Sequence, residues 1–262
     1  MKTKNPGLAL FSFIVYLFLL GPLLIIAVTS FEPGQVLKFP PTGFSLKWYQ
    51  NIFDVEMFMS TFKTSIFVSL LGNVIAILLG VPAAYALNRV TFRGKDTLNA
   101  VFLSPLLIPG IVLGFTLLKY VVITFHFPIY TSLLIGHTII MLPFIIRVIG
   151  SSLANFDFAV EEAALSLGSS RLGTFFKVVL PNIKSGIIAS VLLAFLESFN
   201  NVDISLFMTG PGVSTLPIQM LTYVENYFDP TIAAISVLLM LITAVFMFVI
   251  ERLLGLTYFT KQ

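Results

Sequence analysis

The sequence predicts an all-α membrane protein with six transmembrane helices, on three observations. Apolar residues make up 57% of the 262 residues and charged residues only 10%, against roughly 25% in an ordinary soluble domain. The mean hydropathy over the whole chain is +1.00, which a water-soluble surface does not tolerate. Six apolar stretches are each long enough to cross roughly 30 Å of hydrocarbon, and the positive charges gather on one side of them.

The first three predicted spans are free of charge or nearly so. The first, about 8–29, is longer than the core of a signal peptide, and no clear small-residue cleavage site follows it. We therefore expect a transmembrane helix there. The second covers about 64–88. The third covers about 97–118 and contains Pro105 and Pro109, which are expected to kink it.

Two of the last three predicted spans carry candidate functional polar residues. The fourth, about 127–146, contains His137. We expect His137 to be a satisfied interior histidine, and a proton relay is the alternative. The fifth, about 185–208, carries two carboxylates, and the sixth, about 231–250, is uncharged.

Lysine and arginine positions predict that both termini are cytoplasmic. With the N-terminus inside, 11 of the 15 positive residues lie in cytoplasmic segments and 4 in outer ones, and the opposite orientation inverts the bias. The cytoplasmic set is Lys2, Lys4, Arg89, Arg93, Lys95, Arg147, Arg171, Lys177, Lys184, Arg252 and Lys261, and the outer set is Lys38, Lys47, Lys63 and Lys119. We expect residues 1–262 to form a single transmembrane domain with a cytoplasmic loop over 155–181.

That cytoplasmic loop has the pattern of two short helices joined at a glycine. A helix can start near Asp157, and Gly168 suits its end because glycine adopts a left-handed backbone without penalty. A second short helix is expected over about 170–179, stopped by Pro181. The two helices would lie at the membrane face and could present a knob to a soluble partner.

Side chains in the first of these helices fit such a contact. Glu161 and Glu162 lie in its first turns, where negative charge is favourable. Ala163 and Ala164 are small enough to let another surface approach closely. From these residues alone, an interfacial amphipathic loop without a partner is an equally good interpretation.

The order of residues in this loop resembles the EAA loop of permeases from ATP-binding-cassette (ABC) importers. The matching residues are Glu162-Ala163-Ala164, then Gly168 after three residues, then Val178 after nine more, and finally Leu180-Pro181. Valine in place of isoleucine is the one departure from the pattern. The resemblance implies the type I ABC importer (MetI-like) permease fold in a bacterial inner membrane. It also implies that the first part of the motif shapes a coupling helix that docks on a separate ATPase, while Leu180 and Pro181 anchor it to the next membrane helix.

Shorter matches extend the resemblance over nearly the whole chain, to the second permease subunit of spermidine/putrescine-type importers. They are Lys47-Trp48-Tyr49, Phe92-Arg93-Gly94-Lys95, Thr209-Gly210-Pro211 and Leu216-Pro217. The resemblance implies an ATPase dimer that binds ATP and Mg²⁺, a second and related permease, and an extracytoplasmic solute-binding protein. A polyamine is the favoured solute, but permeases for phosphonates, opines and iron chelates are similar.

Four polar residues of the fifth span are candidates for the substrate pathway. Glu197, Asn200, Asn201 and Asp203 follow one another at helical spacing and could line it. Polar contacts with a neighbouring subunit are the alternative. Polyamine permeases tend to have acidic residues where Asn200 and Asn201 stand, which weakens the case for a polycationic solute.

No catalytic residue, metal site or bound cofactor is predicted for this chain. There is no cysteine, the two histidines are isolated, and no phosphate-binding loop of the form G-x-x-x-x-G-K-[ST] occurs. Nucleic acid is not an expected partner. A stand-alone secondary transporter, with Glu197, Asp203 or His137 as an ion site, is the other class of function, although such folds usually show internal repeats and none is evident.

Overall fold

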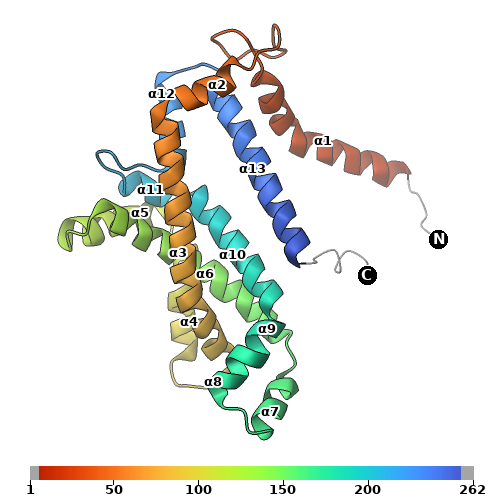
Figure 1. Ribbon diagram of the computed structural model, residues 1–262, viewed down its shortest axis with the longest axis vertical. Helices are drawn as coiled ribbons and strands as arrows, with labels where there is room; N and C mark the ends of the chain where they lie inside the picture. The colour runs from red at the N-terminus through yellow and green to blue at the C-terminus, as the bar shows by residue number, and fades with distance from the viewer. Residues whose placement is uncertain (1–5, 255–262) are drawn as a thin grey trace. The chain divides into compact units, whose positions relative to one another are not determined.

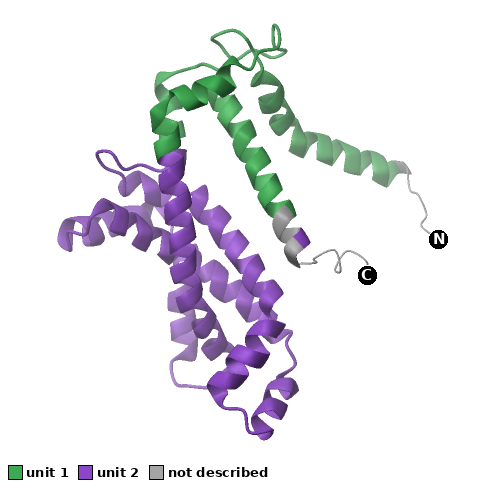
Figure 2. Cartoon of the chain, viewed as in Figure 1, with its two compact units in different colours: residues 1–60, 219–249 green, residues 61–218, 250–262 purple. Residues whose placement is uncertain are grey.

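A computed structural model describes residues 6–254, which are mostly helical, with the longest connection at residues 30–46 (Figure 1). The isolated bridge between Gly210 and Val213 is the one β-contact within this range. The chain divides into two compact units, residues 1–60 with 219–249 and residues 61–218 with 250–262 (Figure 2). Lys2, Lys4 and Lys261, on which the orientation partly depends, lie outside the described residues.

Between residues 6 and 254, four helices are long and apolar enough to cross a membrane. They are α1 (Pro6–Thr29), α3 (Glu56–Arg89), α6 (Ile129–Ala154) and α13 (Thr231–Leu254). Each coincides with a predicted span, although α3 begins before residue 64 and α6 continues past residue 146. The number of spans rises to six if two bent helix pairs each count as one.

The first bent pair occupies the third predicted span. It consists of α4 (Lys95–Leu103), the 3₁₀ turn η1 (Ser104–Leu106), α5 (Gly110–Leu117) and the π-helix η2 (Leu118–Thr124). The two halves meet at an angle of 100°. Pro109 immediately precedes α5 and disfavours helical backbone at the residue before it. The predicted kink is confirmed, and it is a full break.

The second bent pair precedes and includes the fifth predicted span. It joins residues Arg171–Asn182 to α10 (Lys184–Phe199) at 72°. The chain then breaks again before α11 (Asp203–Phe207), so the continuous helix predicted over 185–208 is wrong. We call residues 200–202 the fifth-span break. Asparagine side chains compete with the helix for backbone hydrogen bonds, which explains why the helix ends there.

Small residues let α3 and α6 approach closely in the core of the second unit. Gly72, Ala76, Gly80 and Ala84 follow one another at intervals of four along α3. A Cβ atom on Gly80 would lie 2.7 Å from the side chain of Ile145 on α6. Such stripes allow dense helix packing in lipid, where the hydrophobic effect does not drive association.

The first unit contains α2 (Lys47–Asp54) together with most of α12 (Leu216–Asn226). Trp48 on α2 is buried at 5% exposure, and its indole Nε1 donates to the Glu32 carbonyl at 2.7 Å. A buried indole needs such a partner.

Glu32 closes the loop that precedes α2. Its carboxylate accepts the Thr42 hydroxyl at 2.5 Å, the Thr42 backbone N–H at 2.7 Å and the Gly34 N–H at 2.9 Å. These bonds, that of the Thr42 hydroxyl foremost, lower the pKa of Glu32 below its ordinary value.

Candidate functional site

We call residues 155–181 the EAA segment, and its first helix is α7 (Phe158–Ser166). Asp157 begins it as predicted, since its carboxylate accepts the Ala159 N–H at 2.9 Å. Gly168 ends it with φ +88°. The Ser169 N–H donates to the Ala164 carbonyl and the Gly168 N–H to that of Leu165, the double bond pattern of a Schellman cap.

The second half of the EAA segment runs further than predicted. It comprises α8 (Arg171–Thr174), the π-helix η3 (Phe175–Val179) and α9 (Leu180–Asn182). Pro181 was expected to stop this helix, and the helix does end beside it, at Asn182, before the 72° bend into α10.

Among the motif residues of this second half, burial is uneven. Val178 and Leu180 are half-buried, and Pro181 is exposed. Between them, Val179 is fully buried and belongs to the core of the second unit. The sequence motif did not single out Val179, although its neighbours carry the motif.

Glu161 and Glu162 lie in different surroundings. The side chain of Glu161 is buried, with the residue only 4% exposed, whereas Glu162 and Ala163 are exposed and Ala164 is half-buried. A buried carboxylate is costly unless it is paired and hydrogen-bonded, and α3 supplies both partners.

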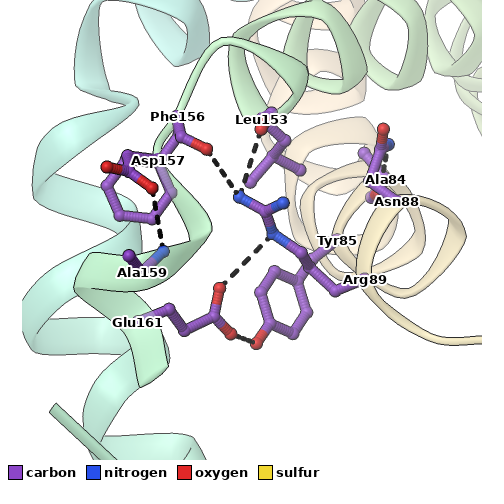
Figure 3. A network of polar contacts seen from close by, with 9 residues as sticks. All are labelled: Ala84, Tyr85, Asn88, Arg89, Leu153, Phe156, Asp157, Ala159 and Glu161. Atoms are coloured by element: carbon purple, nitrogen blue, oxygen red, sulfur yellow. Dashed lines mark hydrogen bonds and ion pairs between the residues drawn. The ribbon is translucent and has the colours of Figure 1, made fainter. Parts of the chain in front are cut away.

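Arg89 and Tyr85, at the end of α3, hold the carboxylate of Glu161 (Figure 3). Arg89 Nε lies 3.3 Å from Glu161 Oε2, and the Tyr85 hydroxyl donates to Glu161 Oε1. The Tyr85 ring also meets the Phe175 ring edge-on at 4.9 Å between centroids. The last turn of α3 is therefore fastened to both halves of the EAA segment.

The same guanidinium also binds the end of α6. Arg89 Nη2 donates to the carbonyls of Leu153 and Phe156 at 3.1 Å each, and its central carbon lies 4.9 Å from the Phe158 ring centroid. Arginine suits this place because its planar fork bonds several acceptors at once. Three elements, α3, α6 and α7, meet at this one side chain.

No sequence motif predicts this network. Arg89 is one positive charge of the predicted cytoplasmic set, and Tyr85 belongs to no predicted site. The ion pair joins residues 72 positions apart, and no local pattern in the sequence links them.

On the outward face of the EAA segment, apolar side chains accompany the exposed carboxylate of Glu162. Six large apolar side chains on or near its helices are exposed, namely Phe158, Val160, Leu165, Leu167, Leu172 and Phe176. Leu167 is the most open of them at 89% exposure. Apolar side chains gathered at one site with a charged residue are typical of a protein interaction surface.

The four polar residues predicted for the pathway do not lie on one helix. Glu197 is half-buried on α10, and Asn200 is exposed beyond its end. Asn201 lies in the fifth-span break, where its Oδ1 accepts the Ile204 N–H at 2.9 Å. Asp203 begins α11. The break thus gathers three of them at one point rather than along a stripe.

Asp203 packs against the start of α5. A methyl group on Gly110 would overlap the Asp203 carboxylate, and one on Gly114 would lie 2.7 Å from the Asp203 carbonyl oxygen. Negative charge is favourable at the N-terminus of a helix. This contact joins the break in the fifth span to the break in the third. Among residues 6–254, no group of three or more acidic, histidine or cysteine residues could hold a metal ion.

Two curated proteins are similar to nearly the whole chain. The putrescine transport system permease protein PotI of Escherichia coli is 30% identical over 244 residues, covering 90% of this chain and 86% of that protein. The spermidine/putrescine transport system permease protein PotC of Haemophilus influenzae is 28% identical over 233 residues, covering 89% of this chain and 90% of that protein.

Solved structures of ABC importers have the same fold. A chain of a bacterial ABC transporter that imports the acidic polysaccharide alginate matches with a TM-score of 0.70 and 19% identity, over 97% of this chain and 96% of that one. An inward-facing MetNI methionine ABC transporter matches with a TM-score of 0.60 and 19% identity, over 76% of this chain and 93% of that one.

The family described as binding-protein-dependent transport system inner membrane component matches residues 72–257, which is more than half of the chain. The chain belongs to this family and is a multi-pass permease subunit of an ABC importer in a bacterial inner membrane.

Proposed function

We propose that this chain forms half of the translocation pathway of an ATP-driven importer for small amines of the putrescine and spermidine class. The observation that carries the substrate class is the 30% and 28% identity to permeases for putrescine and for spermidine/putrescine. A half-buried carboxylate, Glu197, close to the fifth-span break supports it, since an ammonium group is a natural partner for such a carboxylate.

The two asparagines at the break favour an amine of low charge. Asn200 and Asn201 can accept hydrogen bonds from ammonium groups through their amide oxygens, but they add no negative charge. A longer polycation would need more countercharge than Glu197 and Asp203 supply. We therefore rank putrescine above spermidine as the substrate.

In the proposed topology the chain spans the membrane six times, and residues 1–262 act as one permease domain. Each bent helix pair then counts as one span. The N-terminus, the C-terminus and the EAA segment are cytoplasmic, which agrees with the excess of lysine and arginine on that side.

The outward face of the EAA segment would dock on the ATPase. Glu162, Ala163 and the exposed Leu167 would enter its groove, while Glu161 faces inward to Arg89. Closure of the ATPase pair around ATP and Mg²⁺ would pull α7, and the Arg89 ion pair would transmit that pull to α3. Gly168 keeps α7 separate from the following helix, and Leu180 and Pro181 lead into α10.

Three partners complete the importer in this proposal. They are the ATPase dimer, a second and related permease chain, and an extracytoplasmic protein that delivers the solute. Rigid-body rocking of the two permeases would expose the fifth-span break first to one side of the membrane and then to the other.

Uptake of labelled putrescine by proteoliposomes containing the complete importer tests the proposal. We expect uptake that requires both ATP and the binding protein, with putrescine preferred to spermidine. A phosphonate, an opine and an iron chelate serve as comparison solutes. Uptake of one of these instead would overturn the amine assignment, and uptake by this chain alone under an ion gradient would favour a secondary transporter.

A further inference from the structure

A buried histidine bridges the two sides of the fifth-span break. His137 lies in the middle of α6 and is 2% exposed. Its Nδ1 lies 2.8 Å from the hydroxyl of Ser198, in the last turn of α10, and its Nε2 lies 3.1 Å from that of Ser205, in α11. The prediction of a satisfied interior histidine is confirmed, but both of its bonds go to the broken span.

The hydrogen bonds around His137 have one consistent direction. The Ser205 hydroxyl donates to the Asn201 carbonyl at 2.8 Å, so it must accept from His137 Nε2. In a neutral imidazole the other nitrogen then accepts, so Ser198 donates to Nδ1. Ser198 in turn accepts from Ser69 on α3, 3.0 Å away. With a neutral ring, each hydrogen bond from Ser69 through Ser198, His137 and Ser205 to the Asn201 carbonyl has one donor and one acceptor.

This series of hydrogen bonds does not form a proton path. It begins at Ser69, which is buried at 1% exposure, and it ends on the Asn201 carbonyl, which cannot pass a proton on. Its geometric effect is different. One rigid ring on α6 binds a residue before the break and a residue after it.

Close packing beside His137 leaves α11 little freedom. A Cβ atom on the adjacent Gly136 would lie 2.7 Å from Ile204, which is fully buried. The backbone of α6 therefore touches α11 directly at the point where the bridge is made. A hydrogen bond between polar groups at such a contact fixes direction, whereas apolar packing alone does not.

We propose that His137 is a positioning residue for transport: it fixes the angle between α10 and α11, and with it the place of Asn200, Asn201 and Asp203. The bridge itself follows from the geometry alone. Its effect on transport rests on the proposed function, in which those residues border the pathway.

Distances between spin labels on α10 and α11 test the bridge. Leu193 and Leu206 are exposed, one on each helix, and the chain has no cysteine of its own. Both are replaced by cysteine and labelled in the complete importer, whose other subunits carry no reactive cysteine. Pulsed electron resonance then gives the distribution of the distance between the two labels, with no substrate present.

We expect a narrow distribution in the parent chain and a broader or shifted one after Ser205→Ala or His137→Leu. Ser205→Ala removes a single hydroxyl, so it separates loss of the bridge from failure to fold. Ser190→Ala is the matched control, because Ser190 is a buried serine of α10 whose hydroxyl bonds only to Ile187 of its own helix. His137→Gln, which can still reach Ser205, should restore the narrow distribution.

Two results would overturn the bridge. One is an unchanged distribution in both Ser205→Ala and His137→Leu. The other is an equal broadening in Ser190→Ala, which would mean that any lost hydroxyl loosens the helices.

Putrescine uptake by the same variants tests the functional half. We expect Ser205→Ala to lower Vmax by about fivefold, the factor that corresponds to one hydrogen bond, with KM unchanged because the binding protein delivers the solute. Normal Vmax together with a broadened distance would refute the role in transport. Absence of uptake in the parent chain would refute the substrate class, and the distances would still decide the bridge.

Discussion

At the scale of single residues, Glu161 and Glu162 are identical in chemistry and opposite in surroundings. Glu161 is inside, held by Arg89 and Tyr85, and Glu162 is exposed. Removing one partner of a buried ion pair leaves an uncompensated charge and costs about 3–5 kcal/mol, whereas replacing both can be nearly neutral. This asymmetry allows the structural role of the pair to be separated from its role in coupling.

Arg89→Gln alone should lower the yield of folded protein from the membrane more than the double variant Arg89→Gln/Glu161→Gln does. In the double variant two neutral amides replace the ion pair, so no charge is left buried. We expect it to fold but to hydrolyse ATP with little transport, because the ion pair that ties α7 to α3 is lost and only the Tyr85 hydrogen bond can remain. The measurements are detergent-extracted yield, ATP hydrolysis and solute uptake.

Glu162→Gln is the matched control for that pair of variants. Because Glu162 is exposed, its replacement should leave the yield unchanged and affect only association with the ATPase. Equal loss of yield in Arg89→Gln and in the double variant would contradict the assignment of the ion pair.

Glu197→Gln should lower transport more than Asp203→Asn does. Asp203 packs against the N-terminus of α5, where asparagine has a similar shape, whereas Glu197 is half-buried without a described partner and is free to meet a solute. Uptake rates of the two variants decide between them. Equal or reversed effects would mean that the pathway does not pass Glu197.

At the scale of elements, the end of α7 depends on one backbone conformation. Gly168 has φ +88°, and nothing lies within 4 Å of where its Cβ would be. A side chain there meets no clash, so any effect comes from the backbone, at a cost of roughly 1–2 kcal/mol for a left-handed residue.

Gly168→Pro should uncouple ATP hydrolysis from transport and leave the membrane helices intact. Proline cannot adopt this φ, and it removes the N–H that bonds the Leu165 carbonyl. Gly94→Pro is the matched control. Gly94 too has φ +88° and open space around it, but it lies before α4, outside the EAA segment. Normal coupled transport in Gly168→Pro, measured with hydrolysis in one preparation, would refute the role of this bend.

The loop before α2 should respond to acid through Glu32. Its pKa is lowered in the folded chain, so its stabilising effect is complete above the ordinary value and is lost as the pH falls through the lowered one. Trp48, the single tryptophan, bonds the Glu32 carbonyl, and its fluorescence reports the loop. We expect the Trp48 fluorescence to change only as the pH falls through the lowered pKa of Glu32, and Glu32→Gln should remove this pH dependence. A fluorescence that responds identically in both chains would contradict this.

At the scale of the whole molecule, the chain should not act alone. We expect the tagged chain to retain its ATPase on purification, and Leu167→Asp to release it, because a charge would enter an apolar contact. Leu107 is similarly exposed but lies in the bend before α5, so Leu107→Asp should leave association unchanged. Retention of the ATPase by Leu167→Asp would contradict docking through the EAA segment.

Much of this architecture follows from the sequence, because its determinants are local. Apolar runs place the helices, Pro109 predicts the kink in the third span, and Asp157 and Gly168 delimit α7. Each of these depends on residues within a few positions of one another. The motif from Glu162 to Pro181 likewise has fixed spacing, so it is visible in one chain.

Contacts between distant segments could not be predicted in this way. Arg89 of α3 and Glu161 of α7 meet through the packing of α3, α6 and α7 within the second unit. The fifth-span break was missed for a related reason. Residues 185–208 are apolar enough for one helix, and the two residues that flank the break and bond to His137 are more than 60 positions away from it.

The π-helix at Phe175–Val179 gives the length of the EAA motif a geometric meaning. A π-helical turn holds one residue more than an α-helical turn between the same two ends. Deleting one residue there would be absorbed by a return to ordinary winding, whereas deleting one from an α-helical turn rotates everything before it by about 100° about the axis. The π-helix therefore accommodates its extra residue between Gly168 and Leu180 without turning the helix on either side of it.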